Sequence, residues 1–142
     1  MEFRTKINIP VSDVKINHSA VTMLFGSCFS THIGSKLQQH KFHVDVNPFG
    51  ILYNPFSISV ALRRLSQRRD FTEQDLVYRE GMYHSFMHHG QFSSPDKNKC
   101  LETINNRFMK AADTLLETDF LLVTFGTAYV YWQIDSGEIA AN

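Results

Sequence analysis

Short, uniformly apolar runs alternate along the chain with segments whose apolar residues recur every three or four positions. The runs at 21–25 (VTMLF) and 119–126 (DFLLVTFG) are typical of strands buried on both faces of a sheet. Residues 42–46 (FHVDV) alternate as a further strand does. Because such strands need helices on both faces, the pattern predicts an α/β domain.

Three helical segments separate these strands. The first follows the first strand at once, with Ser30 or Thr31 as the expected N-cap. The second covers 56–67, and the basic residues at its end are expected to form a solvated face. The third is expected to start with Ser94 as its cap and to end near residue 117.

Two hairpins complete the predicted architecture. One is expected around Glu80–Gly81, and the other turns at Ser136–Gly137. The length of 142 residues suits one domain over 1–142. Because the chain stops within the second hairpin, we expect this domain to be truncated after Asn142.

Composition and charge narrow the classes of function. Hydrophobic residues make up 43% of the chain and charged ones 20%, which predicts a packed core. Fourteen basic and fourteen acidic side chains cancel, so no electrostatic feature favours a nucleic acid or a membrane as partner. We find no apolar stretch suited to a signal peptide or a transmembrane helix, and expect a cytoplasmic protein. The oligomeric state is not indicated.

The junction at 26–29 (GSCF) is the candidate reactive site, because there the first strand gives way to a helix. Ligands of α/β sheets gather beyond the carboxyl ends of the strands, and a helix N-terminus stabilises negative charge. Gly26 permits the tight turn, and a thiolate on Cys28 or a developing oxyanion would be stabilised beyond it. Spacing alone still favours the plainer interpretation, in which the turn simply needs small residues.

Four segments, in order over nearly the whole chain, resemble the GSCFA domain family, which is grouped with the SGNH (GDSL-like) hydrolases. They are FGSCFS at 25–30, VNPFGILYNPFSI at 46–58, YHSFMHHGQFS at 83–93 and VTFGTAYVY at 123–131. Ser30 replaces the alanine of the family's Gly-Ser-Cys-Phe-Ala motif. The resemblance implies a three-layer, flavodoxin-like fold and an ester hydrolase or acyltransferase that forms a covalent acyl-enzyme. It also implies a small-molecule or carbohydrate-linked acyl ester as substrate.

The resemblance further implies roles for single residues. Aligned without a gap, the motif puts Cys28 at the nucleophile position, and a shift by one puts Ser27 there. Ala128 stands where the SGNH pattern has an asparagine, and a lost oxyanion donor can cost on the order of 3 kcal/mol of transition-state stabilisation. The positions implied for oxyanion or substrate binding are Gly26, Gly50, Gly126 and Thr127.

The general base is left open. SGNH hydrolases take it from a late Asp-x-x-His, which the C-terminal part of this chain lacks. The base would then lie beyond this sequence or come from His84 or His88, which would share one face of a strand, with His89 on the other. Structural histidines are the plainer interpretation of each. With only Glu80 nearby, no metal site is expected, and no cofactor is implied.

A non-catalytic binding module is the alternative function. It would keep the fold and lack the complete catalytic set, as Ala128 and the missing Asp-x-x-His both suggest. Cys100, within the apolar stripe of the third helix, is expected to be a buried small hydrophobe.

Overall fold

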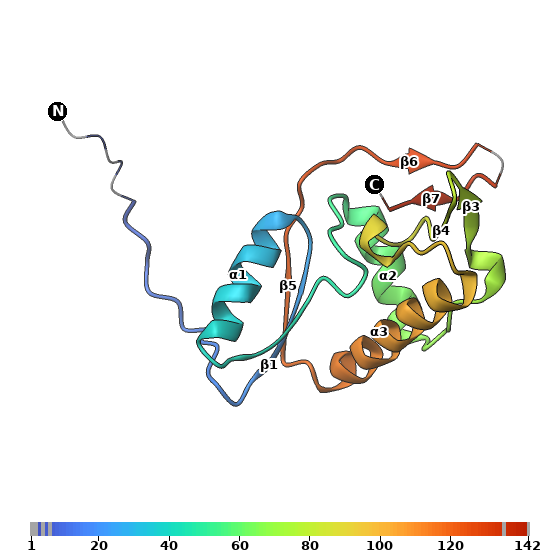
Figure 1. The fold of residues 1–142 in the computed structure, drawn as a ribbon. Coiled ribbons are helices and arrows are strands. Elements are labelled where there is room, and N and C mark those ends of the chain that lie inside the picture. The colour runs from blue at the N-terminus through green and yellow to red at the C-terminus, as the bar shows by residue number, and fades with distance from the viewer. Residues whose placement is uncertain (1–2, 4, 6, 135, 142) are drawn as a thin grey trace.

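A parallel three-stranded sheet forms the centre of the computed structural model, which describes residues 3, 5, 7–134 and 136–141. Strand β1 (Val21–Phe25) lies between β2 (His43–Val46) and β5 (Phe120–Val123) (Figure 1). It pairs in parallel with both neighbours. The predicted α/β class is therefore confirmed.

Three α-helices accompany the sheet. Helix α1 (Cys28–Gln39) connects β1 to β2, while α2 (Pro55–Ser66) and α3 (Lys97–Glu117) lie in the crossover from β2 to β5. Parallel neighbours cannot be joined by tight turns, so crossovers of this kind are required. Figure 1 shows α1 on one side of the sheet and both α2 and α3 on the other.

The core lies between the sheet, α2 and α3, and its centre is aromatic. Met23 and Phe25 point from one face of β1 into this core, while Leu24 is buried without belonging to it, as the alternation of a strand requires. From α3, the buried side chains include Ile104 and Phe108. The predicted stripe on α3 is confirmed, including Cys100, which is fully buried.

Short elements connect and flank these layers. The predicted hairpins are both present, and the positive φ angles of Glu80 and Gly81 form the first turn. The remaining elements are the 3₁₀ helices η1 (Glu73–Asp75) and η2 (Gly90–Phe92) and the strands β3 (Val77–Arg79), β4 (Met82–His84), β6 (Tyr131–Trp132) and β7 (Ile139–Ala140).

Both predicted helix caps were wrong. Helix α1 begins earlier than expected, since Ser27 takes extended backbone and its Oγ accepts the N–H of Phe29. Helix α3 begins later, because Asp96 accepts the Lys99 N–H at 3.0 Å. Ser94 does not cap it because its backbone is paired with Tyr83 in a β-bridge.

Three further expectations need correction. The strand expected at 119–126 is shorter, and Leu121 is 44% exposed because β5 is an edge strand of the described sheet. The basic end of α2 is not wholly solvated, since Arg64 is buried against Asp75. Strand β4 ends at His84, so it does not extend to His88, whose N–H bonds Ser85 in a turn.

None of the helices formed by the described residues is both long and apolar enough to cross a bilayer.

Candidate active site

The β1–α1 junction leaves one reactive side chain exposed, the thiol of Cys28. Cys28 is the first residue of α1 and is exposed to solvent, whereas Ser27 before it is half-buried. The thiol forms no hydrogen bond with any described residue. At this position it lies beside the unpaired N–H groups of a helix N-terminus, which stabilise a developing negative charge.

Ser27 is instead part of a hydroxyl network whose donors can be assigned. Ser30 Oγ donates to the Phe25 carbonyl at 3.1 Å. The 2.7 Å contact between Ser30 Oγ and Thr124 Oγ1 is therefore donated by Thr124. Thr124 Oγ1 then accepts from the Ser27 N–H at 3.3 Å and from the Ser27 hydroxyl at 3.4 Å.

The network leaves Ser27 with a structural task. Its hydroxyl hydrogen points to Thr124, and its oxygen accepts the Phe29 N–H as the helix cap. It also explains the one departure from the family motif, because the Ser30 hydroxyl links β1 to the end of β5, which an alanine could not do. Of the pair, Cys28 is thus the residue whose side chain has no hydrogen-bond partner among the described residues.

Asn47 holds the junction from the β2 side. Its Oδ1 accepts the Gly26 N–H at 2.8 Å, and its Nδ2 donates to Thr31 Oγ1 at 2.9 Å. The Gly26 carbonyl accepts the Leu52 N–H at 3.1 Å. Sequence reasoning identified the Asn-Pro turn but missed this side-chain role, for which the only signal was an asparagine directly after a strand.

Only glycine fits at position 26. Its φ is 140°, and a Cβ there would lie 2.2 Å from the backbone oxygen of Thr124. The turn that exposes Cys28 therefore depends on the absence of a side chain at Gly26, as the sequence predicted.

The other predicted oxyanion positions have their amides engaged. The Gly50 N–H bonds the Asn47 carbonyl at 2.8 Å. The N–H groups of Gly126 and Thr127 both bond the Tyr53 carbonyl, at 2.8 and 3.2 Å. Among the described residues, the backbone N–H of Cys28 has no hydrogen-bond partner. The Thr127 hydroxyl can also still donate, because its Oγ1 only accepts a hydrogen bond, from the Tyr129 N–H.

His84 is held within the first hairpin. Its Nε2 lies 3.2 Å from the Arg79 carbonyl and must donate, so in the neutral ring Nδ1 accepts from Ser93 Oγ at 2.8 Å. Both ring nitrogens are therefore satisfied locally.

His88 is buried in the aromatic core. Its ring stacks on Phe49 at 4.7 Å, and its Nδ1 lies 3.0 Å from Ser85 Oγ. Burial lowers the pKa of His88 from 6.5 to about 3, and the positive charge of Arg64 adds to this while Asp75 partly opposes it. His88 is consequently neutral at physiological pH.

His89 is the clustered histidine whose contacts lead to the junction. It is exposed, and its Cβ lies so close to Gly50 that a Cβ on that glycine would approach it to 2.3 Å. The loop through Gly50 continues to Leu52, which bonds Gly26. His88 also contacts this loop, through Phe49, but its ring is buried. His89 is thus the exposed histidine beside the loop that supports Cys28.

The comparisons with known proteins identify the family. The model of the GSCFA family matches residues 21–142. The chain belongs to the GSCFA family. Neither the curated proteins nor the solved structures gave a match.

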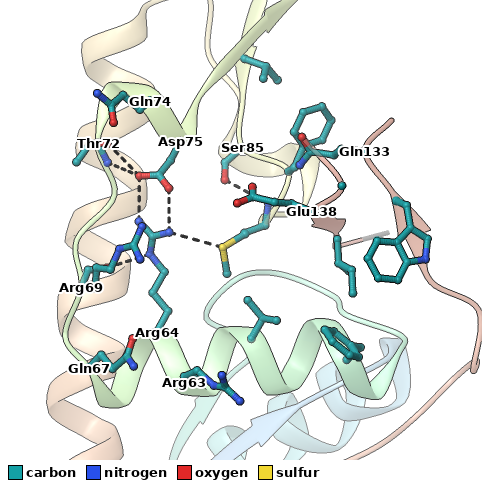
Figure 2. Close-up of a pocket in the computed structure, with 18 residues that line it drawn as sticks. Arg63, Arg64, Gln67, Arg69, Thr72, Gln74, Asp75, Ser85, Gln133 and Glu138 are labelled. Carbon is teal, nitrogen blue, oxygen red and sulfur yellow. Dashed lines mark hydrogen bonds and ion pairs between the residues drawn. The ribbon is translucent and has the colours of Figure 1, made fainter. Parts of the chain in front are cut away.

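A cavity of this GSCFA-family chain lies away from the junction. It has a volume of about 610 Å³ and is bounded by α2, η1 and the β6–β7 hairpin (Figure 2). It shares no lining residue with the β1–α1 junction. Arg64 in its wall forms a bidentate ion pair with Asp75, with Nη1 donating to Oδ1 at 2.8 Å and Nη2 donating to Oδ2 at 3.0 Å.

That ion pair keeps the Asp75 carboxylate ionised. Partial burial raises the pKa of Asp75, but the hydrogen bond and charge of Arg64, together with the Thr72 N–H, outweigh it and lower the pKa below 3.8. Burial also raises the pKa of the Cys100 thiol, so this GSCFA domain keeps its second cysteine protonated and inert. Among the described residues, no three His, Cys, Asp or Glu side chains converge to hold a metal ion.

Proposed function

We propose that this GSCFA domain transfers an acyl group, as an ester hydrolase or acyltransferase, with Cys28 as its nucleophile. The observation that carries the proposal is the contrast within the Ser27–Cys28 pair, in which the serine hydroxyl is fully used and the thiol is exposed at a helix N-terminus.

The proposed chemistry proceeds through a thioester. The Cys28 thiolate attacks the ester carbonyl carbon, and the carbonyl oxygen takes the negative charge beside the Cys28 N–H. The alkoxide then leaves and takes up a proton. Water or an acceptor hydroxyl attacks the thioester carbonyl, releases the acyl group and restores the thiol.

With a thiol as the nucleophile, the chain depends less on the Asp-x-x-His and the asparagine of the SGNH pattern. A cysteine is a strong nucleophile at neutral pH even before a base assists it, unlike a serine hydroxyl. The base predicted at His84 or His88 stays a prediction, because the structure gives both rings other partners. We propose His89 as the histidine to test instead, since it is exposed and lies beside Gly50. Its Nδ1 accepts the Gln91 N–H at 3.2 Å, so this bond has to open before that nitrogen can take up a proton.

We further propose that the sheet is part of a three-layer, flavodoxin-like arrangement of the SGNH type. The order β2-β1-β5 and the helices on both sides of the sheet support this. We propose a small-molecule or carbohydrate-linked acyl ester as the substrate class. This is a separate proposal from the fold, because a fold does not specify a substrate.

The test measures p-nitrophenyl acetate turnover and the site of the acyl adduct by mass spectrometry. We expect the adduct on Cys28, acylation about tenfold faster than that of glutathione at equal concentration, and loss of both in Cys28→Ala. Ser27→Ala is the matched control and should keep the adduct. An adduct on Ser27, or turnover unchanged in Cys28→Ala, would contradict the proposal.

The second candidate is a binding module without catalysis. It is favoured by the engaged amides of Gly50, Gly126 and Thr127, which leave few donors for an oxyanion. This alternative predicts that Cys28 reacts only as fast as glutathione and that the thioester, once formed, persists. His89→Ala would then leave acylation unchanged, whereas the enzyme proposal expects about a tenfold loss.

A further inference from the structure

We propose that the cavity between α2 and the β6–β7 hairpin binds a sugar that carries an anionic group, either a carboxylate or a phosphate. Its volume of about 610 Å³ falls in the range of small-molecule sites. The proposal is independent of the acyl-transfer chemistry, because no residue of the junction lines this cavity.

Two arginines provide the anion-binding part. Arg63 and Arg69 line the cavity, both are exposed, and neither guanidinium forms a hydrogen bond or ion pair with another described residue. An unpaired guanidinium donates two parallel hydrogen bonds to a carboxylate or phosphate. Figure 2 shows both arginines on the side of the cavity formed by α2 and the segment that follows it.

The neighbouring charges do not cancel these two. The carboxylate of Asp75 is already neutralised by Arg64 through two hydrogen bonds, and Arg64 also lies 3.6 Å from the centre of the Phe71 ring. Arg64 is therefore held as a fixed part of the wall. The positive charge available to a ligand is that of Arg63 and Arg69. Glu138 on the hairpin opposes it with one negative charge, so one net positive charge remains in the lining.

Two exposed aromatic residues of the lining favour a sugar over a bare anion. Trp132 in β6 and Phe56 in the first turn of α2 are 64% and 53% exposed, so each can offer a ring face to the apolar face of a sugar. Gln133 and Glu138 are accessible from the same hairpin, and an amide and a carboxylate both accept hydrogen bonds from hydroxyl groups. A plain phosphate ion would leave these acceptors unused.

Trp132 makes the proposal directly measurable, because it is the only tryptophan of the chain. Its fluorescence would be titrated in the intact protein with trigalacturonate, galactose 6-phosphate and neutral galactose. We expect a saturable change with at least one of the two anionic sugars, and binding of galactose at least about tenfold weaker. A response to trigalacturonate alone assigns a carboxylate site, and a response to galactose 6-phosphate alone assigns a phosphate site.

Variants separate the site from unspecific charge attraction. Arg63→Gln and Arg69→Gln should each weaken binding about tenfold, whereas Arg79→Gln, an exposed arginine of the first hairpin outside the cavity, should leave it unchanged. Unfolding midpoints equal to that of the parent protein show that each variant is folded. The proposal is overturned if neither anionic sugar gives a saturable change up to about 10 mM, if galactose binds equally well, or if both cavity variants bind like the parent.

Discussion

The β1–α1 junction and the α2 cavity use their polar side chains in opposite ways. At the junction, the polar groups around Cys28 are used up internally, by Asn47, Thr124 and Ser30. In the cavity, two arginines keep their guanidinium groups free and only Arg64 is committed to the wall. A single reactive atom needs a rigid support, whereas a binding site needs donors and acceptors that are still available. The first region is therefore expected to be sensitive to backbone changes and the second to changes in side-chain charge.

Gly26→Ala should have the largest effect. The new Cβ would lie 2.2 Å from the Thr124 carbonyl oxygen at a φ of 140°, so we expect the free energy of unfolding to fall by about 4 kcal/mol. Urea denaturation measures this. Gly81→Ala has a positive φ but open space and should cost about 1 kcal/mol, and Gly90→Ala has neither constraint. Equal losses in all three would show that the junction is not unusually tight.

Replacing Arg64, the buried arginine of the cavity wall, should have the second-largest effect on stability. Arg64→Met leaves the partly buried Asp75 carboxylate without its cation, and we expect a loss of about 3 kcal/mol in unfolding free energy. Arg68→Met is the matched control, because Arg68 pairs with Asp113 on the surface and should cost less than about 1 kcal/mol. Similar costs for the two variants would mean that Arg64 is not a structural part of the wall.

The pH dependence of stability tests whether His88 is buried as a neutral ring in the aromatic core. The pKa of His88 is lowered in the folded protein, so the unfolded chain binds the extra proton first as pH falls below 6.5. Stability should therefore fall by about 2 kcal/mol between about pH 7 and pH 5, and the loss should continue toward the folded pKa of about 3. His88→Gln should flatten this slope. Protonation of Asp75 lowers the stability only at lower pH, because the pKa of this carboxyl in the folded protein lies below 3.8. An unchanged slope in the variant would contradict the burial of a neutral His88.

Ser27→Ala should have the smallest effect. Loss of the α1 cap is expected to cost about 1 kcal/mol in unfolding free energy. Ser35→Ala, at an exposed position within α1, provides the baseline of less than about 0.5 kcal/mol. If Ser27→Ala had no effect beyond that baseline, the assigned hydroxyl network would be wrong.

Much of the fold could be predicted because its signals are local. The apolar run at 21–25, the stripe on α3 and the Glu80–Gly81 turn each depend on residues next to one another in the sequence. The helix caps could not be predicted, because Ser27, Ser30 and Ser94 offer equivalent hydroxyl groups. What chose between them were distant partners, namely Thr124 at the end of β5 and Tyr83 in β4.

The sequence by itself determined the α/β class, the place of the candidate Gly-Ser-Cys-Phe turn and, through its motifs, membership of the GSCFA family. Only the tertiary structure decided which neighbour in that turn is free, because the hydroxyl of Ser27 is taken up by a threonine 97 residues away. It likewise separated three histidines that are nearly adjacent in sequence into a hairpin, a core and a surface loop. Contacts between distant segments set burial and hydrogen bonding, and these in turn decide which side chains remain available for chemistry.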